Sequence, residues 1–86
     1  MDFRLTNHVR EEMARRAIPL PLLEQVLTAP QQVVAEKVNL KAYQSIVSCE
    51  EEKPFLLRVI VDDSISPMVV ITAYRTSKIE KYWRSE

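Results

Sequence analysis

Four β-rich segments, joined by connections too short to hold a helix, limit what this chain can fold into. From Gln31 onward, β-branched residues alternate with polar ones in the manner of half-buried strands. We expect strands at about 32–38, 41–49, 55–62 and 67–75. The connections at Asn39, 50–54 and 62–67 are short and polar, which predicts antiparallel hairpins because parallel neighbours need a long crossover.

Two amphipathic helices are expected before the strands. Thr6 can cap a helix that runs to about Arg16, with apolar residues recurring along one side. The proline-containing stretch 18–21 breaks this helix and leads into a second one at roughly 22–28, which Pro30 ends. The sequence therefore predicts an α+β fold, with two N-terminal helices packed on one face of a four-stranded antiparallel sheet.

Composition indicates one small domain and the kind of compartment that it occupies. The 86 residues, 47% of them hydrophobic, suit a single domain spanning residues 1–86. Cys49 has no second cysteine to pair with, and the start of the chain does not resemble a cleavable signal segment. The apolar runs are too short to cross a membrane. We expect a cytoplasmic protein with no membrane partner.

The residue types that are missing exclude several classes of site. The chain has no glycine, which excludes the phosphate-binding loops of Walker and Rossmann sites. One histidine and one cysteine cannot form a zinc cluster, and no acidic spacing suggests a carboxylate metal site. We predict no metal and no cofactor. The net charge of zero argues against nonspecific duplex binding, but the arginines gather toward the two ends and leave a local basic face open.

His8 is the only imidazole, and imidazole is the group that ordinarily exchanges protons near neutral pH. Glu12 and Arg16 follow at helical spacing, so a carboxylate could orient the imidazole while a guanidinium contacts a phosphate. The alternative is that His8 only helps the helix to begin and that Glu12 and Arg16 form a surface pair.

Arg58 lies inside an apolar strand between Leu56 and Ile60. A guanidinium in that position must be paired or directed into a cleft, because an isolated buried charge is costly. The alternative is an edge-strand arginine that lies along the sheet with its head in water.

The last strand ends in a group of polar, basic and aromatic residues. Thr72, Tyr74 and Arg75 leave it together, and the basic residues Lys78 and Lys81 follow. Cations interleaved with aromatic rings suit single-stranded nucleic acid, where the cations meet phosphates and the rings stack on bases. The alternative is a turn whose apolar and aromatic side chains hold it on the core; these are Ile79, Tyr82 and Trp83.

The order of these features resembles a known family. The chain is similar to small prokaryotic domains of unknown function. The resemblance lies in the sequence 6–8, then Met13, Arg16 and Ile18, then a proline-ended second helix, four strands and the closing sequence 70–75. These domains are grouped with the RelE and BrnT toxins, and the ending, from Ile71 to Tyr82, is also similar to that of BrnT-type ribonuclease toxins.

The resemblance implies the microbial ribonuclease-toxin fold and metal-independent cleavage of RNA by the 2′-hydroxyl. Carried over by position, His8, Arg58 and Arg75 would form the site with Thr72 and Tyr74 beside them, the two arginines stabilising charge on the phosphorane. Arg16, Lys78 and Lys81 would hold the RNA backbone.

Two positions depart from the family pattern. The family often has an arginine where this chain has Glu12 and a glycine where it has Ala17. A carboxylate at position 12 would repel a phosphate unless Arg16 or His8 neutralises it.

The function expected from the sequence is that of a metal-independent RNA endonuclease, the toxin of a type II toxin–antitoxin pair acting on mRNA. Its partners would be RNA and a cognate antitoxin protein; the sequence leaves the oligomeric state open. One alternative is a catalytically inactive RNA- or protein-binding module of the same fold. Another is a subunit whose exposed strand edge pairs with a second chain.

Overall fold

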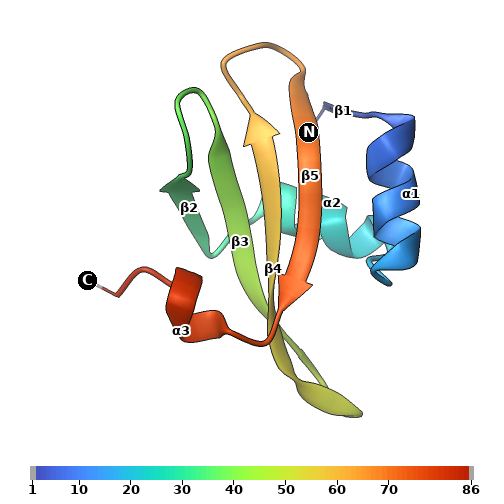
Figure 1. Cartoon of the computed structure of the whole chain (residues 1–86), viewed down its shortest axis with the longest axis vertical. Helices are drawn as coiled ribbons and strands as arrows, with labels where there is room; N and C mark the ends of the chain where they lie inside the picture. The colour runs from blue at the N-terminus through green and yellow to red at the C-terminus, as the bar shows by residue number, and fades with distance from the viewer. Residues whose placement is uncertain (1, 86) are drawn as a thin grey trace.

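The computed structural model describes residues 2–85, which form one five-stranded sheet with three helices (Figure 1). The strand order is β1-β5-β4-β3-β2. The elements in chain order are β1 (Phe3–Leu5), α1 (Asn7–Arg15), α2 (Leu20–Thr28), β2 (Gln32–Ala35), β3 (Lys41–Cys49), β4 (Glu52–Asp62), β5 (Met68–Thr76) and α3 (Ile79–Tyr82). The α+β class predicted from the sequence is confirmed.

The prediction of a four-stranded antiparallel sheet is wrong in two respects, and β1 accounts for both. This strand of three residues pairs parallel to β5, with Phe3 opposite Met68 and Leu5 opposite Val70. The sheet is therefore mixed. Three residues are too few for a recognisable alternation of polar and apolar side chains, and the partner strand lies at the far end of the sequence.

The other four strands form the antiparallel meander that the short connections predicted. The third element, Lys41–Cys49, has the predicted bounds. The strand expected at 32–38 ends earlier, at Ala35, because the chain turns back there. In this turn Leu40 donates its backbone N–H to Lys37, and Asn39 has a φ of 67°, a left-handed conformation that asparagine tolerates.

Both predicted helices form, and local chemistry explains their ends. Thr6 caps α1 by accepting the backbone N–H of Val9 at 3.1 Å. Helix α2 begins at Leu20, two residues before the expected start, because Pro21 fits the first turn of a helix, where its missing N–H has no partner to lose.

The core lies between α1, α2 and one face of the sheet. Side chains alternate along β4, so Leu57, Val59 and Val61 face α1 and α2 and are fully buried. Leu23 and Leu27 of α2 pack against them. Figure 1 shows α2 behind the strands and α1 beside β5. The opposite face of β4 carries Leu56, Arg58 and Ile60.

The outer edge of β5 has two different neighbours. Residues Met68–Val70 pair with β1, and the register then shifts, so that Val61 faces Val70 and Ile60 faces Thr72. Beyond this bulge α1 lies along β5, where Arg16 donates to the backbone carbonyl of Ala73 at 2.8 Å. A helix thus covers a strand edge that would otherwise be open.

Candidate functional site

The structure divides the predicted catalytic residues among three places. His8 and Thr72 lie where α1 meets β5. Arg58 and Tyr74 lie on the sheet face opposite α1 and α2. Arg75 lies on the face that those helices cover, where it contacts Ala17. The residues therefore do not converge on one pocket.

A row of four polar side chains crosses β2, β3, β4 and β5, and we call it the polar row. The strand register places Gln32 opposite Gln44, Gln44 opposite Arg58, and Arg58 opposite Tyr74. The Gln44 amide donates to Gln32 at 2.8 Å, Arg58 Nε donates to Gln44 at 2.8 Å, and Arg58 Nη1 donates to the Tyr74 hydroxyl at 2.6 Å. One chain of hydrogen bonds thus links four strands.

Arg58 is buried and fully engaged within the protein. Only 3% of the residue is exposed, and its Nη2 pairs with the carboxylate of Glu36. The Tyr82 ring lies 4.4 Å from the guanidinium carbon, within the range of a cation–π contact. Arg58 lies on a central strand, so the alternative of an edge-strand arginine is wrong. The guanidinium has no free edge for a phosphate while these partners are in place.

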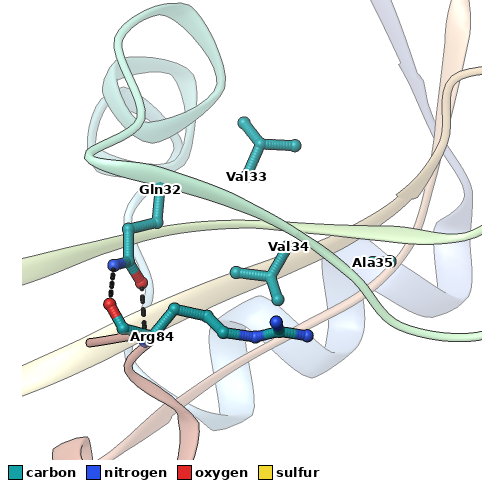
Figure 2. A pocket seen from close by; sticks show the side chains of 5 residues that line it. All are labelled: Gln32, Val33, Val34, Ala35 and Arg84. Carbon is teal, nitrogen blue, oxygen red and sulfur yellow. Dashed lines mark hydrogen bonds between the residues drawn. The ribbon is translucent and has the colours of Figure 1, made fainter. Parts of the chain in front are cut away.

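The segment after β5, residues 77–85, covers the polar row, and we call it the α3 segment. Gln44 donates to the backbone carbonyl of Tyr82 at 3.2 Å. Figure 2 shows the other end of the contact, where the Gln32 side chain forms two hydrogen bonds with the backbone of Arg84. The segment is therefore held on the sheet, as one sequence interpretation proposed, although by these polar contacts.

Tyr74 is poorly suited to take a proton from a substrate near neutral pH. Burial raises the pKa of its phenol, and the hydrogen bond from Arg58 only partly offsets this effect. The Tyr74 and Tyr82 rings pack edge to face, with centroids 6.1 Å apart. Tyr74 thus belongs to the covered polar row.

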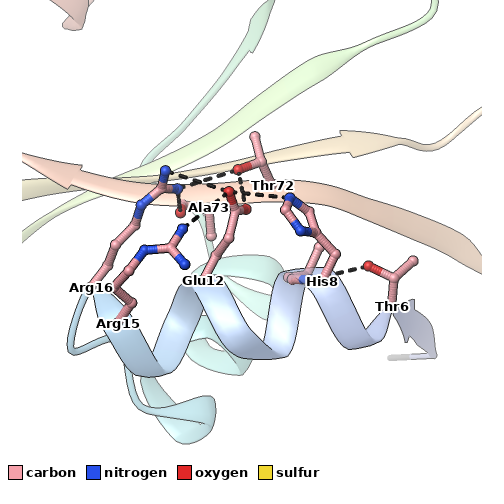
Figure 3. A network of polar contacts seen from close by, with 8 residues as sticks. Thr6, His8, Glu12, Arg15, Arg16, Thr72 and Ala73 are labelled. Carbon is pink, nitrogen blue, oxygen red and sulfur yellow. Dashed lines mark hydrogen bonds and ion pairs between the residues drawn. The ribbon is translucent and has the colours of Figure 1, made fainter.

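A second cluster, centred on Glu12, joins α1 to β5 (Figure 3). His8 Nε2 lies 3.4 Å from Glu12 Oε2, and the Thr72 hydroxyl donates to Glu12 Oε1 at 2.8 Å. Arg16 Nη2 lies 3.4 Å from the same carboxylate, and Arg15 Nη2 lies 3.8 Å from it. We call these five residues the Glu12 cluster.

The surroundings of Glu12 favour the ionised form of its carboxyl group and place positive charges beside it. The hydrogen bond from Thr72 lowers the pKa of the carboxyl below its ordinary value, against the opposing effect of burial. The positive charges of Arg16, His8 and Arg15 act in the same direction as Thr72. The charge of the Glu12 carboxylate is therefore compensated. The repulsion between this carboxylate and a phosphate, expected from the sequence, is reduced accordingly.

Exposure decides which members of the Glu12 cluster can contact a ligand. The side chain of His8 is 72% exposed and that of Arg15 is 64% exposed, whereas that of Arg16 is 35% exposed. Arg16 also donates to Thr72 and to the Ala73 carbonyl, so it holds α1 on β5. Arg15 is the freer cation, and sequence reasoning missed it although it lies three residues after Glu12.

Arg75 has a structural environment on the other side of the sheet. Its Nη2 contacts both oxygens of Glu52, at 3.1 and 3.0 Å, and its Nη1 donates to the Ala17 carbonyl at 3.3 Å. The Phe55 ring lies 3.9 Å from the guanidinium carbon. Arg75 thereby links the end of α1 to β4.

Lys78 and Lys81 are exposed on the α3 segment. The Lys78 backbone N–H donates to the Thr76 hydroxyl, and the Lys81 ammonium lies 5.3 Å from the Tyr82 ring centroid. Their charged ends can meet a phosphate in solution.

Three residues of this network were not predicted from the sequence: Gln44 and Glu36, which contact Arg58, and Gln32, which contacts Gln44. The sequence did contain a signal for Gln44. It shares one face of its strand with Ala42 and Ile46, and a polar side chain on an apolar face needs a hydrogen-bond partner. Every buried side-chain nitrogen and oxygen in the described residues has a hydrogen-bond partner.

Residues 2–85 bring together no group of three or more His, Cys, Asp or Glu side chains that could hold a metal ion. Over the same residues no helix is long and apolar enough to span a membrane.

A comparison with protein families identifies the group to which the chain belongs. The model of DUF4258, described as a domain of unknown function, matches residues 5–75. The chain is a member of this family. The DUF4258 match contains the Glu12 cluster and the polar row and stops before the α3 segment. No curated protein and no solved structure matches the chain. The kinship with RelE and BrnT toxins stays a prediction.

Proposed function

We propose that this protein is a metal-independent RNA endonuclease, the toxin of a type II toxin–antitoxin pair, and that the Glu12 cluster is its site. The observation that carries the proposal is the position of His8. An exposed imidazole lies 3.4 Å from a buried, charged carboxylate, with the exposed Arg15 beside the same carboxylate. This is the arrangement of proton acceptor, orienting group and phosphate-binding cation that the reaction needs.

The reaction assigns a role to each exposed group. His8 accepts the proton of the ribose 2′-hydroxyl, whose oxygen attacks the adjacent phosphorus. The bond from phosphorus to the 5′-oxygen breaks, and that oxygen takes a proton from solvent, which leaves a 2′,3′-cyclic phosphate and a 5′-hydroxyl. Arg15 stabilises the charge on the phosphorane, and Glu12 holds the imidazole in place. Thr72 and Arg16 fix Glu12 in place.

The proposed reaction defines the class of substrate. A 2′-hydroxyl is required, so the substrate is RNA, and a cluster on an exposed helix and strand edge suits a single strand whose phosphates are accessible. Lys78 and Lys81 provide further exposed positive charge for the backbone. Arg58 and Arg75, which the resemblance placed in the site, take no part because each is engaged elsewhere.

The test is cleavage of single-stranded RNA with EDTA present. His8→Ala should lower the rate by about 100- to 10,000-fold, the usual contribution of a general base. Arg10→Ala is the matched control, since Arg10 is exposed on the same helix and lies outside the Glu12 cluster. Full activity of folded His8→Ala protein would remove the proposed role.

A second candidate function is binding without cleavage, and one observation favours it. The structure offers one exposed proton-transfer group in the Glu12 cluster, and the two strand arginines expected to stabilise the phosphorane lie apart from it. In that case RNA gel shifts would show a complex with intact RNA, and the shift would weaken in Arg15→Ala protein.

The toxin role has its own test in cells. Induced expression of the wild-type chain should arrest growth, and His8→Ala should relieve the arrest at equal protein level. Growth that is unaffected by the wild-type chain would favour the binding module. Rescue by the product of a neighbouring gene would identify the antitoxin.

A further inference from the structure

The α3 segment is held like a bound peptide. Gln32 accepts the backbone N–H of Arg84 at 3.1 Å and donates to its carbonyl at 2.6 Å, so one side-chain amide pairs with both backbone groups of one residue (Figure 2). Gln44 donates to the carbonyl of Tyr82. These three hydrogen bonds are made to backbone groups of the segment and do not depend on which side chains it carries.

One side chain adds selectivity to this contact. The Tyr82 ring lies 4.4 Å from the Arg58 guanidinium carbon and packs edge to face on Tyr74. Trp83 has extended backbone angles, with φ of −74° and ψ of 130°, and separates Tyr82 from Arg84, whose backbone Gln32 binds. The aromatic residue of the segment thus lies two positions before the residue whose backbone Gln32 binds.

The α3 segment has little structure of its own and leaves part of the neighbouring surface uncovered. Helix α3 is a single turn with no buried residue, and no side chain caps its start. Next to the clamp lies an open hollow of about 350 Å³, lined by Gln32–Ala35 of the edge strand β2 and by Arg84. A longer extended segment could continue along β2 from the clamped residue.

We infer that the polar row is a peptide-binding site which the chain's own α3 segment fills in cis. The ligand it would take is an extended segment of a partner protein, with an aromatic residue two positions before a residue bound through its backbone. The Arg58 guanidinium is the anchor for the aromatic ring, and Gln32 and Gln44 bind the main chain. The family match ends at Arg75, so the receptor residues lie inside it and the cis occupant lies outside. The inference is independent of RNA cleavage.

Trp83 is the only tryptophan of the chain, which allows the cis segment to be followed in the intact protein. A peptide spanning residues 79–85, with Trp83 replaced by phenylalanine, should change the Trp83 emission of the wild-type protein saturably as it displaces the segment. The same peptide with Tyr82 also replaced by alanine should leave the emission unchanged. Equal effects of both peptides, or no effect of either, would overturn the inference.

A second arm uses a chain whose own segment is weakened. The labelled peptide should bind full-length Tyr82→Ala protein more tightly than wild type by about tenfold or more, because a tethered competitor acts at high effective concentration. Adding Gln32→Ala to that chain should abolish binding, with circular dichroism confirming the fold. Equal affinity for the two chains, or retained binding without Gln32, would contradict the clamp. A doubling of mass in light scattering would show exchange between copies and overturn the assignment to a partner protein.

Discussion

Arg58 and Arg75 lie on opposite faces of the sheet, although their positions are only one cross-strand row apart. Arg58 faces Tyr74 in the register, and Arg75 faces Leu57 in the next row. Because side chains alternate along a strand, the first guanidinium enters the polar row and the second joins Ala17 and Glu52. A site that uses both arginines on one phosphate is incompatible with this register. Substitutions of Arg58 and of Arg75 should therefore have different effects.

Arg75→Ala should destabilise the fold and leave the chemistry of the folded protein intact. The change removes a partly exposed ion pair, a hydrogen bond to Ala17 and a contact with Phe55, together about 1–2 kcal/mol. Urea unfolding would measure the loss, and Lys53→Ala, at an exposed position of β4, should change stability by less than about 0.5 kcal/mol. Cleavage that disappears while the protein remains folded would return Arg75 to the site.

Arg58→Met should lower the free energy of unfolding far more than Arg75→Ala does, because it leaves Glu36 and Gln44 without their partner. Removing one member of a buried pair typically costs about 3–5 kcal/mol, a large part of the stability of a small domain. Adding Glu36→Gln removes the charge left behind and should recover part of the loss. Urea unfolding of the single and double variants gives the comparison, and a double variant no more stable than Arg58→Met alone would contradict the pairing.

The sequence was sufficient for the elements whose signals are local. Thr6 as a cap, the strand Lys41–Cys49 and the antiparallel meander follow from capping, alternation and short connections. Strand β1 could not be predicted because its pairing with β5 joins the two ends of the sequence.

The site residues were harder to place, because the strand pattern puts Arg58 and Arg75 on two successive strands but does not show which face of the sheet each side chain takes. That choice depends on register, and the bulge opposite Ile60 shifts it within β5. The helical spacing of His8, Glu12 and Arg16 did indicate one cluster, because spacing on a helix fixes the face. Thr72 joined that cluster only through the tertiary contact of α1 with β5.

Glu12 should make the stability of the fold depend on pH in a defined direction. The pKa of its carboxyl is lowered in the folded protein from the ordinary value of 4.5, mainly by the Thr72 hydrogen bond. A lowered pKa means that the contribution to stability is present above the unfolded value and is lost as the pH falls through the folded one. Stability measured by urea unfolding should therefore fall below about pH 5.

Two variants isolate this contribution from that of other carboxylates. Glu12→Gln removes the titrating group, and Thr72→Val removes the hydroxyl that donates to it, so both should flatten the acid limb of the stability curve. Asp62 also has a lowered carboxyl pKa, owing to its hydrogen bonds with Ser64, and accounts for part of the slope that remains. An acid limb identical in wild type and both variants would show that Glu12 is not linked to folding.

The backbone conformation of Ala17 offers a prediction about stability alone. Its φ of 55° places it in the left-handed region at the end of α1, which costs an L-residue about 1–2 kcal/mol and costs glycine nothing. Ala17→Gly should therefore raise stability by about 0.5–1 kcal/mol even after the greater freedom of glycine in the unfolded chain is counted. The backbone carbonyl that Arg75 contacts is retained. Thermal unfolding should show a higher midpoint for Ala17→Gly and a lower one for the matched control Ala14→Gly, which lies inside α1 where glycine is unfavourable. Equal decreases in both variants would mean that the conformation at position 17 carries no strain for alanine.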